Sequence, residues 1–236
     1  MNKIVEECEV FFNLFGLKWG DVKSKLIDAD LEYIVNDIVI YEKKNIGCHP
    51  IQMVHFAAVS IILKNVKNIL EIGTWSGITS RDLSKLFPQS TIYTIDVPEA
   101  DPDYLTSTNF RGTKTGLSTE ERKLVFEKNT SSDNVKFMAV NSFFLPSLDL
   151  PKKFDIIFVD GDHAYPQVAG DIMFAYNHVK SGGFLFMHDC RIISGKPIND
   201  VSRAIYWIKK RIKEEVIMLL GCWERRADKM ALIMKE

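Results

Sequence analysis

The sequence predicts an α/β fold in which a seven-stranded, mostly parallel sheet carries helices on both faces. Short apolar runs, typical of strands buried on both sides, alternate with amphipathic helical patterns from residue 48 to the end of the chain. The first run passes at Gly73 into a glycine turn and then a helical pattern, as parallel α/β units do. With 236 residues and 46% hydrophobic content, the chain can bury one such core.

The residues before Gly47 are expected to form a helical cap, residues 1–47, ahead of a sheet domain at 48–236. Four apolar residues of this segment share one helix face at the i, i+3, i+4, i+7 spacing: Leu31, Ile34, Val35 and Ile38. Pro50 suits the first turn of a further helix that leads into the first strand.

Seven strands are expected at the apolar runs 68–73, 91–96, 135–140, 154–160, 183–188, 216–220 and 230–234. Two helices should pack on this sheet, with apolar stripes at Val168, Ile172, Ala175 and Val179 and at Val201, Ala204, Ile205, Ile208 and Ile212. The connection at about 98–129 is unusually long, and Ser118 to Glu121 fits a capping box for a helix inside it. This insert is either a lid over a substrate or a passive surface excursion.

Charge and composition exclude several classes of partner. The formal net charge of -1 provides no basic field for nucleic acid. The longest mostly apolar segment, 53–63, is far shorter than the roughly 20 residues that span a membrane. The cysteines lack the C-x-x-C spacing of structural zinc sites, and disulfides are not expected either: Cys8, Cys48, Cys190 and Cys222. We expect a soluble cytoplasmic protein that acts on a small molecule, with a homodimer left open.

The segment Asn68 to Ser80, NILEIGTWSGITS, predicts a cofactor site. A buried strand that ends at a glycine turn and restarts as a helix leaves backbone N–H groups around a pocket at the carboxyl end of the sheet. The dinucleotide fingerprint G-x-G-x-x-G needs glycine where this chain has Trp75, which argues against NAD. Asp96 ends the next strand at about the distance, roughly 20 residues, at which a carboxylate meets ribose hydroxyls.

Ionisable residues follow two later strands, in Phe154 to Tyr165, FDIIFVDGDHAY, and in Gly182 to Cys190, GGFLFMHDC. Because the carboxyl ends of parallel strands meet at one edge of a sheet, five side chains should converge in one crevice. They are Asp160, Asp162, His163, His188 and Asp189.

Together these motifs resemble the class I S-adenosylmethionine-dependent methyltransferases, whose fold is Rossmann-like. E-x-G-x-x-x-G at Glu71 to Gly77 resembles their first motif, and D-G-D-H-x-Y with H-D resembles the members that include the macrocin-type sugar O-methyltransferases. The resemblance covers roughly residues 50–236. It implies methylation of a hydroxyl on a sugar or other small natural-product molecule. It also implies cofactor contacts at Glu71, Gly73, Thr74, Trp75, Gly77, Thr79, Asp96, Asn141, Ser142 and Asp160.

The same resemblance implies that His163 is a general base and that Asp160 and Asp189, with His188, hold Mg²⁺. An alcohol is a poor nucleophile at neutral pH, and a divalent cation or a nearby imidazole would help to remove its proton. The chain departs from the family pattern at His188, where some members have a carboxylate, and at Cys190, where catechol-type relatives have an amide. Since Mg²⁺ prefers oxygen ligands, the metal is left open. Two alternatives also remain: a Rossmann-type NAD(P) oxidoreductase, and a cofactor-binding protein without turnover.

Overall fold

The computed structural model describes residues 2–40, 48–97, 119–222 and 228–236. Its sheet contains β1 (Asn68–Ile72), β2 (Thr91–Asp96), β3 (Val135–Ala139), β4 (Phe154–Val159), β5 (Val179–Ile193), β6 (Lys196–Pro197), β7 (Val216–Leu220) and β8 (Asp228–Met234). The strand order is β3-β2-β1-β4-β5-β8-β7, and the short β6 pairs with β5 alone. Neighbours from β3 to β5 are parallel, whereas β8 is antiparallel to both β5 and β7. The predicted mostly parallel sheet is confirmed, with the seven expected strands on its main path and the short β6 as an additional eighth strand.

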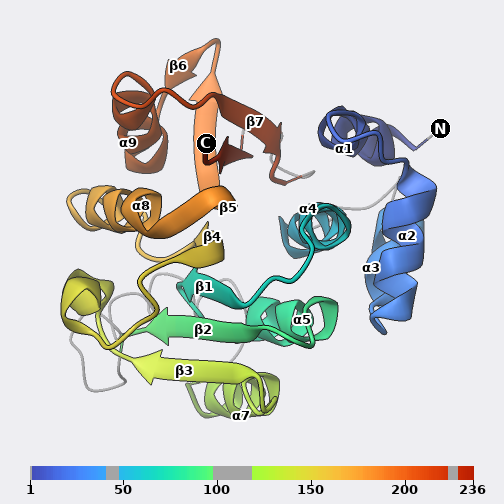
Figure 1. Cartoon of the computed structure of the whole chain (residues 1–236), viewed down its shortest axis with the longest axis horizontal. Coiled ribbons are helices and arrows are strands. Elements are labelled where there is room, and N and C mark those ends of the chain that lie inside the picture. Colours follow the sequence, from blue (N-terminus) through green and yellow to red (C-terminus); the bar gives the residue numbers. More distant parts are fainter. Residues whose placement is uncertain (1, 41–47, 98–118, 223–227) are drawn as a thin grey trace.

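The helices of the described residues are α1 (Lys3–Asn13), α2 (Trp19–Asp28), α3 (Glu32–Ile40), α4 (Cys48–Ile62), α5 (Ile78–Leu86), α7 (Thr119–Asn129), α8 (Gln167–His178) and α9 (Asp200–Lys209), with a 3₁₀ segment, η2 (Ser142–Ser147). Figure 1 shows α4 and α5 on one side of the sheet and α8 and α9 on the other. The prediction of helices on both faces is therefore confirmed.

The two faces of the sheet follow from the two-residue period of its strands. In β4, Ile156 and Phe158 pack in the core beneath α4, whereas Ile157 and Val159 pack in the core beneath α8 and α9. The same alternation separates neighbouring residues of β1 and β5. Both faces are apolar, and this is why these strands read as continuous hydrophobic runs.

The N-terminal helices α1 to α3 share one core with the sheet. Their buried side chains, including Phe11, Phe12 and Ile34, belong to the same cluster as Phe158 of β4. The predicted stripe at residues 31–38 is buried, as expected. The helices of the cap predicted at residues 1–47 therefore share one hydrophobic core with the sheet domain.

Some predicted boundaries were wrong because tertiary pairing overrides local pattern. β5 was expected at 183–188 but spans fifteen residues, because β4 pairs with its first part and β8 and β6 pair with its later part. Val179 therefore begins β5 instead of extending the stripe of α8, which ends at His178. Ile212 lies beyond the end of α9. The proposed capping box at Ser118 falls outside the described residues, while α7 itself is present within the insert.

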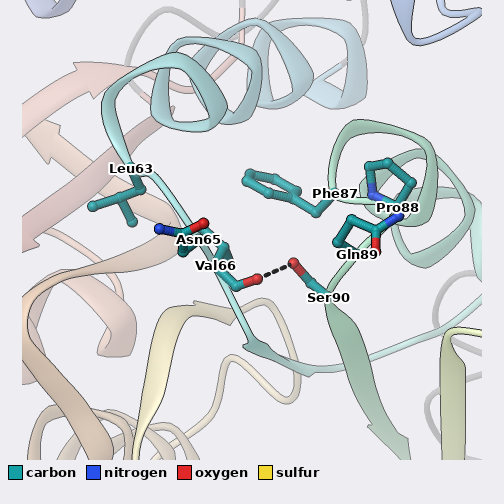
Figure 2. A pocket seen from close by; sticks show the side chains of 7 residues that line it. All are labelled: Leu63, Asn65, Val66, Phe87, Pro88, Gln89 and Ser90. Carbon is teal, nitrogen blue, oxygen red and sulfur yellow. Dashed lines mark hydrogen bonds between the residues drawn. The ribbon is translucent and has the colours of Figure 1, made fainter.

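A shallow pocket of about 190 Å³ lies at the amino ends of β1 and β2 (Figure 2). It is lined by Leu63, Asn65, Val66, Phe87, Pro88, Gln89 and Ser90. The Ser90 hydroxyl donates to the Val66 carbonyl at 2.8 Å, which ties the two strand entries together. No ionisable side chain lines this pocket, and it lies at the opposite end of the strands from Gly73. In the part of the chain that the structure describes, no helix is long and apolar enough to span a bilayer.

Candidate active site

The loop between β1 and α5 has a backbone that only small residues accept easily. Gly73 has φ +101°, and a Cβ atom there would lie 2.3 Å from the carbonyl oxygen of Asp160. Gly77, which precedes α5, has φ +72°, and its Cβ would lie 3.0 Å from Thr130. Trp75 also has a positive φ, 45°, so the loop keeps a left-handed turn where the dinucleotide fingerprint would have glycine.

Asp96, at the end of β2, holds this loop in place. Its Oδ2 accepts the backbone N–H of Trp75 at 2.6 Å, and its Oδ1 accepts that of Val97 at 2.9 Å. Each carboxylate oxygen can accept more than one hydrogen bond. The predicted ribose ligand is therefore also the group that fixes the cofactor loop.

Glu71 lies beneath the loop and is completely buried, at 1% exposure. Its carboxyl group accepts hydrogen bonds from Ser80 and from Thr94, the latter at 2.6 Å. Burial, helped by the nearby charges of Asp160 and Asp96, raises the pKa of Glu71 to about 8, although the two hydrogen bonds lower it. Glu71 thus supports the loop from below, in the anchoring position that the motif predicts.

The other predicted cofactor residues have different surroundings. The buried Thr74 hydroxyl contacts that of Thr94 at 2.6 Å, so its side chain points into the protein interior. Thr79 Oγ1 lies 3.3 Å from His49 Nδ1. Asn141 caps η2 through Phe143 N–H at 3.0 Å. Ser142 accepts a hydrogen bond from Gln167 at 2.5 Å.

A buried aspartate missed by the sequence prediction connects the N-terminal helices to this loop. Asp82 of α5 has no exposed surface, and its carboxylate is bonded by Tyr33 of α3, by His49 Nε2 at 2.8 Å and by Arg81 Nε at 2.7 Å. Burial alone would raise the pKa of Asp82, but these partners hold it below its usual range. A charged residue on the apolar face of α5, beside Leu83, was the only sequence signal of this network.

The second half of the site is created by a bulge in β5. Between Met187 and Cys190, β5 contains one more residue than β8 opposite, and Asp189 has φ 52°. Such bulges redirect side chains at a sheet edge. The Asn199 side chain, which also caps α9, donates to the Asp189 carbonyl at 2.7 Å and stabilises the bulge.

The bulge brings His188 and Asp189 against the loop that follows β4. His188 Nδ1 donates to Asp160 Oδ1 at 2.8 Å. His163 Nδ1 lies 3.2 Å from Asp189 Oδ2, and His163 Nε2 lies 3.4 Å from Asp160 Oδ1. Two imidazoles and two carboxylates thus form one cluster, as the strand ends predicted.

Mutual pairing shifts the pKa of the two most enclosed members. Burial would raise the pKa of Asp160, but the charges and hydrogen bonds of His188 and His163 hold it well below its usual range. Burial would lower the pKa of His188, yet Asp160 and Asp189 raise it to about 9. Asp160 and His188 therefore form a carboxylate–imidazolium pair at neutral pH.

Of the five ionisable residues expected to converge, Asp162 does not join the cluster. It is exposed, and its side chain accepts the Ala164 N–H at 3.0 Å within its own turn. Cys48, at the start of α4, was not predicted here, but its sulfur lies within 4.8 Å of ligand atoms of His188 and Asp189. The two halves meet at Gly73, whose α-carbon packs directly against the backbone of Asp160.

Comparisons with known proteins agree with this geometry. The family model described as "Methyltransferase domain" matches residues 70–190, which include the glycine loop and the whole His–Asp cluster. An uncharacterized protein of Acanthamoeba polyphaga mimivirus is 37% identical over 57 residues, a match that spans 24% of this chain and 26% of that protein.

Several solved methyltransferases have a similar fold. The S-adenosylhomocysteine-bound methyltransferase PaMTH1 of Podospora anserina is 14% identical, with a TM-score of 0.51 over 90% of this chain and 88% of that one. The O-methyltransferase NovP is 18% identical, with a TM-score of 0.51 over 75% of each chain. The N-methyltransferase NodS of Bradyrhizobium japonicum WM9 is 16% identical, with a TM-score of 0.51 over 80% of this chain and 97% of that one.

Proposed function

The chain belongs to the methyltransferase domain family and is an S-adenosylmethionine-dependent methyltransferase, and from this premise we propose that it methylates a hydroxyl group of a sugar or another small natural-product molecule. The cofactor half of the crevice fits S-adenosylmethionine. The Gly73 turn packs against the Asp160 backbone so closely that a Cβ would lie 2.3 Å from the Asp160 carbonyl oxygen, and the Asp96 carboxylate stands at the end of β2 for the ribose hydroxyls. The rival interpretation as an NAD(P) oxidoreductase does not agree with the family.

The position of His163 is the observation that supports a hydroxyl group as the methyl acceptor. Its ring lies between Asp160 and Asp189, at 3.4 and 3.2 Å, on the strand edge that the glycine loop shares. Amine acceptors reach a nucleophilic state by losing a proton in water, whereas an alcohol needs a base at the site. An imidazole that is paired with carboxylates in this way can accept the proton of an alcohol.

The reaction is an in-line displacement. The acceptor oxygen forms a bond to the methyl carbon as the carbon–sulfur bond breaks, and the sulfur keeps the electron pair. The hydroxyl proton passes to the His163 imidazole, and the carboxylates of Asp189 and Asp160, 3.2 and 3.4 Å from its two ring nitrogens, stabilise the imidazolium that forms. His188 donates to the same Asp160 oxygen at 2.8 Å and fixes that carboxylate beside the His163 ring.

Mg²⁺ fits this donor set poorly. The ion prefers oxygen ligands in octahedral geometry, whereas Asp160 is enclosed by two imidazoles and paired with both. The group formed by Asp160, His163 and His188 offers two nitrogens for one carboxylate oxygen. The proposed reaction therefore uses no Mg²⁺ in any step.

The test is direct detection of transfer. The purified protein is incubated with S-adenosylmethionine carrying a labelled methyl group and a panel of sugars, other hydroxylated small molecules and matched amines. We expect S-adenosylhomocysteine together with a labelled methyl ether, in chelated as well as Mg²⁺-containing buffer. Labelled amines in place of ethers would overturn the choice of acceptor. A cofactor that binds but is never converted, across the whole panel, would favour the binding protein without turnover.

A further inference from the structure

Two buried polar atoms of the bulge in β5 are left without hydrogen bonds. Among the described residues, neither Nε2 of His188 nor Oδ1 of Asp189 has a hydrogen-bond partner, and Oδ1 has only the ion-pair contact of 3.3 Å with His188 Nδ1. His188 is only 6% exposed, so water does not readily replace that partner. Unsatisfied buried polar atoms are rare and costly in native proteins, and two adjacent ones point to a missing ligand.

The orientation of His188 indicates what kind of ligand is missing. Its Nδ1 donates to Asp160 at 2.8 Å, which fixes the ring and directs the other nitrogen away from that carboxylate. Histidines that ligate metals almost always donate their second ring N–H to a carboxylate or carbonyl in this way. The Asp160–His188 pair has that arrangement.

A third side chain completes a set of ligands from a distant part of the chain. Cys48 begins α4, and its sulfur, a ring nitrogen of His188 and a carboxylate oxygen of Asp189 all lie within 4.8 Å of one another. Three protein ligands with one open position are typical of reactive zinc sites, with bonds of about 2.0 to 2.3 Å.

We propose that Cys48, His188 and Asp189 bind a divalent ion of the zinc class, with Asp160 orienting His188. Thiolate and imidazole ligands favour borderline and soft ions over Mg²⁺. Binding releases the thiol proton of Cys48 and the Nε2 proton of His188, so one thiolate and one carboxylate neutralise the ion and the enclosed site gains no net charge. The alternative group, Asp160, His163 and His188, already satisfies its charges internally and contains no thiol.

The metal site rests on the proposed function in one respect only. Its open fourth position would hold a water molecule or the hydroxyl group of the acceptor. Binding itself depends neither on the methyl donor nor on the acceptor. The two ideas can therefore fail separately.

The experiment is a Co²⁺ titration of the purified, metal-free full chain, followed by absorption spectroscopy. We expect one Co²⁺ per chain and a thiolate-to-cobalt charge-transfer band in the near ultraviolet. Zn²⁺ should abolish the band by competition, and a large excess of Mg²⁺ should not. Absence of Co²⁺ binding, or binding without the band, would overturn the proposal.

Four variants identify the ligands. Cys48→Ser should lose the band, and Cys48→Asp should restore Zn²⁺ binding without it, which would show that the loss is not misfolding. Cys8→Ala removes a buried thiol of α1 and should leave the band unchanged. Asp160→Asn should keep the band but weaken Co²⁺ binding by about 10- to 100-fold, as expected for a group that acts through a ligand. A band that persists in Cys48→Ser would exclude Cys48.

If the band appears but no hydroxyl compound is methylated, the metal site stands and the proposed acceptor falls. If a methyl ether forms and no band is seen, the proposed function stands without the metal site.

Discussion

The two halves of the crevice are built by different means. The half between β1 and β2 is formed by backbone: positive φ angles at Gly73, Trp75 and Gly77, fixed by the Asp96 carboxylate. The half between β4 and β5 is formed by side chains that pair with one another across a bulge. The comparison teaches that the half proposed for the cofactor (the cofactor half) is shaped by steric exclusion, and the half proposed for the acceptor (the acceptor half) by charge pairing. Substitutions should separate the two.

The largest effect is expected at Gly73, where the halves touch. In Gly73→Ala, a left-handed φ costs about 1 to 3 kcal/mol, and a Cβ only 2.3 Å from the Asp160 carbonyl adds about 1 to 3 kcal/mol of overpacking. Cofactor binding should be lost together with stability, because the Asp160 backbone must move. Urea denaturation and calorimetry with S-adenosylmethionine measure both.

Gly16→Ala is the matched control, because Gly16 also has a positive φ, 67°, but nothing lies within 4 Å of its Cβ position. It should show the cost of the backbone conformation without the collision. Equal effects at both glycines would mean that close approach to Asp160 contributes nothing.

The next largest effect is expected in the acceptor half alone. His163→Ala should lower kcat by about 10²- to 10⁴-fold, because a positioned base typically contributes that much. Affinity for S-adenosylmethionine should stay close to wild type, since the contacts of His163 are to Asp160 in its own loop and to Asp189 of β5, and not to the loop between β1 and α5.

His178→Ala is the control for His163→Ala, because His178 stacks on Phe174 at the end of α8, away from the cluster. Its kcat should be unchanged. An active His163 variant would remove the general base from the proposed reaction, and a variant that loses cofactor affinity would show that the halves are not separable.

The backbone of the cofactor half could be predicted from sequence because its signals are local, whereas the individual cofactor contacts stay predictions. One apolar strand, two glycines and a strand-end aspartate fall within a short stretch, and steric rules translate them directly into backbone. Trp75 shows that this turn does not need glycine at every position. It stands where the dinucleotide pattern has glycine, yet it has a left-handed φ, and its backbone N–H is bonded to Asp96.

The acceptor half could be predicted in composition but not in pairing. Strand ends placed Asp160, His163, His188 and Asp189 at one edge, but the turn that diverts Asp162 and the bulge that aims His188 depend on partners elsewhere in the fold. Cys48 and Asp82 were missed for the same reason. Their contacts link helices that precede β1 to later segments, and no periodicity records such contacts.

An intermediate effect is expected for Asp96→Ala, which should weaken S-adenosylmethionine binding by about 1 to 3 kcal/mol. The carboxylate is lost both to the ribose and to the Trp75 N–H. Calorimetry gives the affinity, and kcat at saturating cofactor should change little. Unchanged affinity in a folded variant would show that β2 does not carry the ribose ligand.

The most gradual effect, spread over several pH units, concerns Glu71, which responds to both halves. Its pKa is raised to about 8 from a usual value of 4.5, so the folded state binds a proton that the unfolded state releases between these pH values. Stability from this group is therefore complete below about pH 4.5 and is lost as the pH rises toward 8, with a slope of at most about 1.4 kcal/mol per pH unit. Glu71→Gln should remove that slope in urea denaturation across this range, whereas Glu215→Gln, at an exposed carboxylate, should retain it. Identical slopes in wild type and Glu71→Gln would contradict the raised pKa. Because the charge of Asp96 helps to raise it, Asp96→Ala should end the slope at a lower pH, and Glu71 would then report on both halves at once.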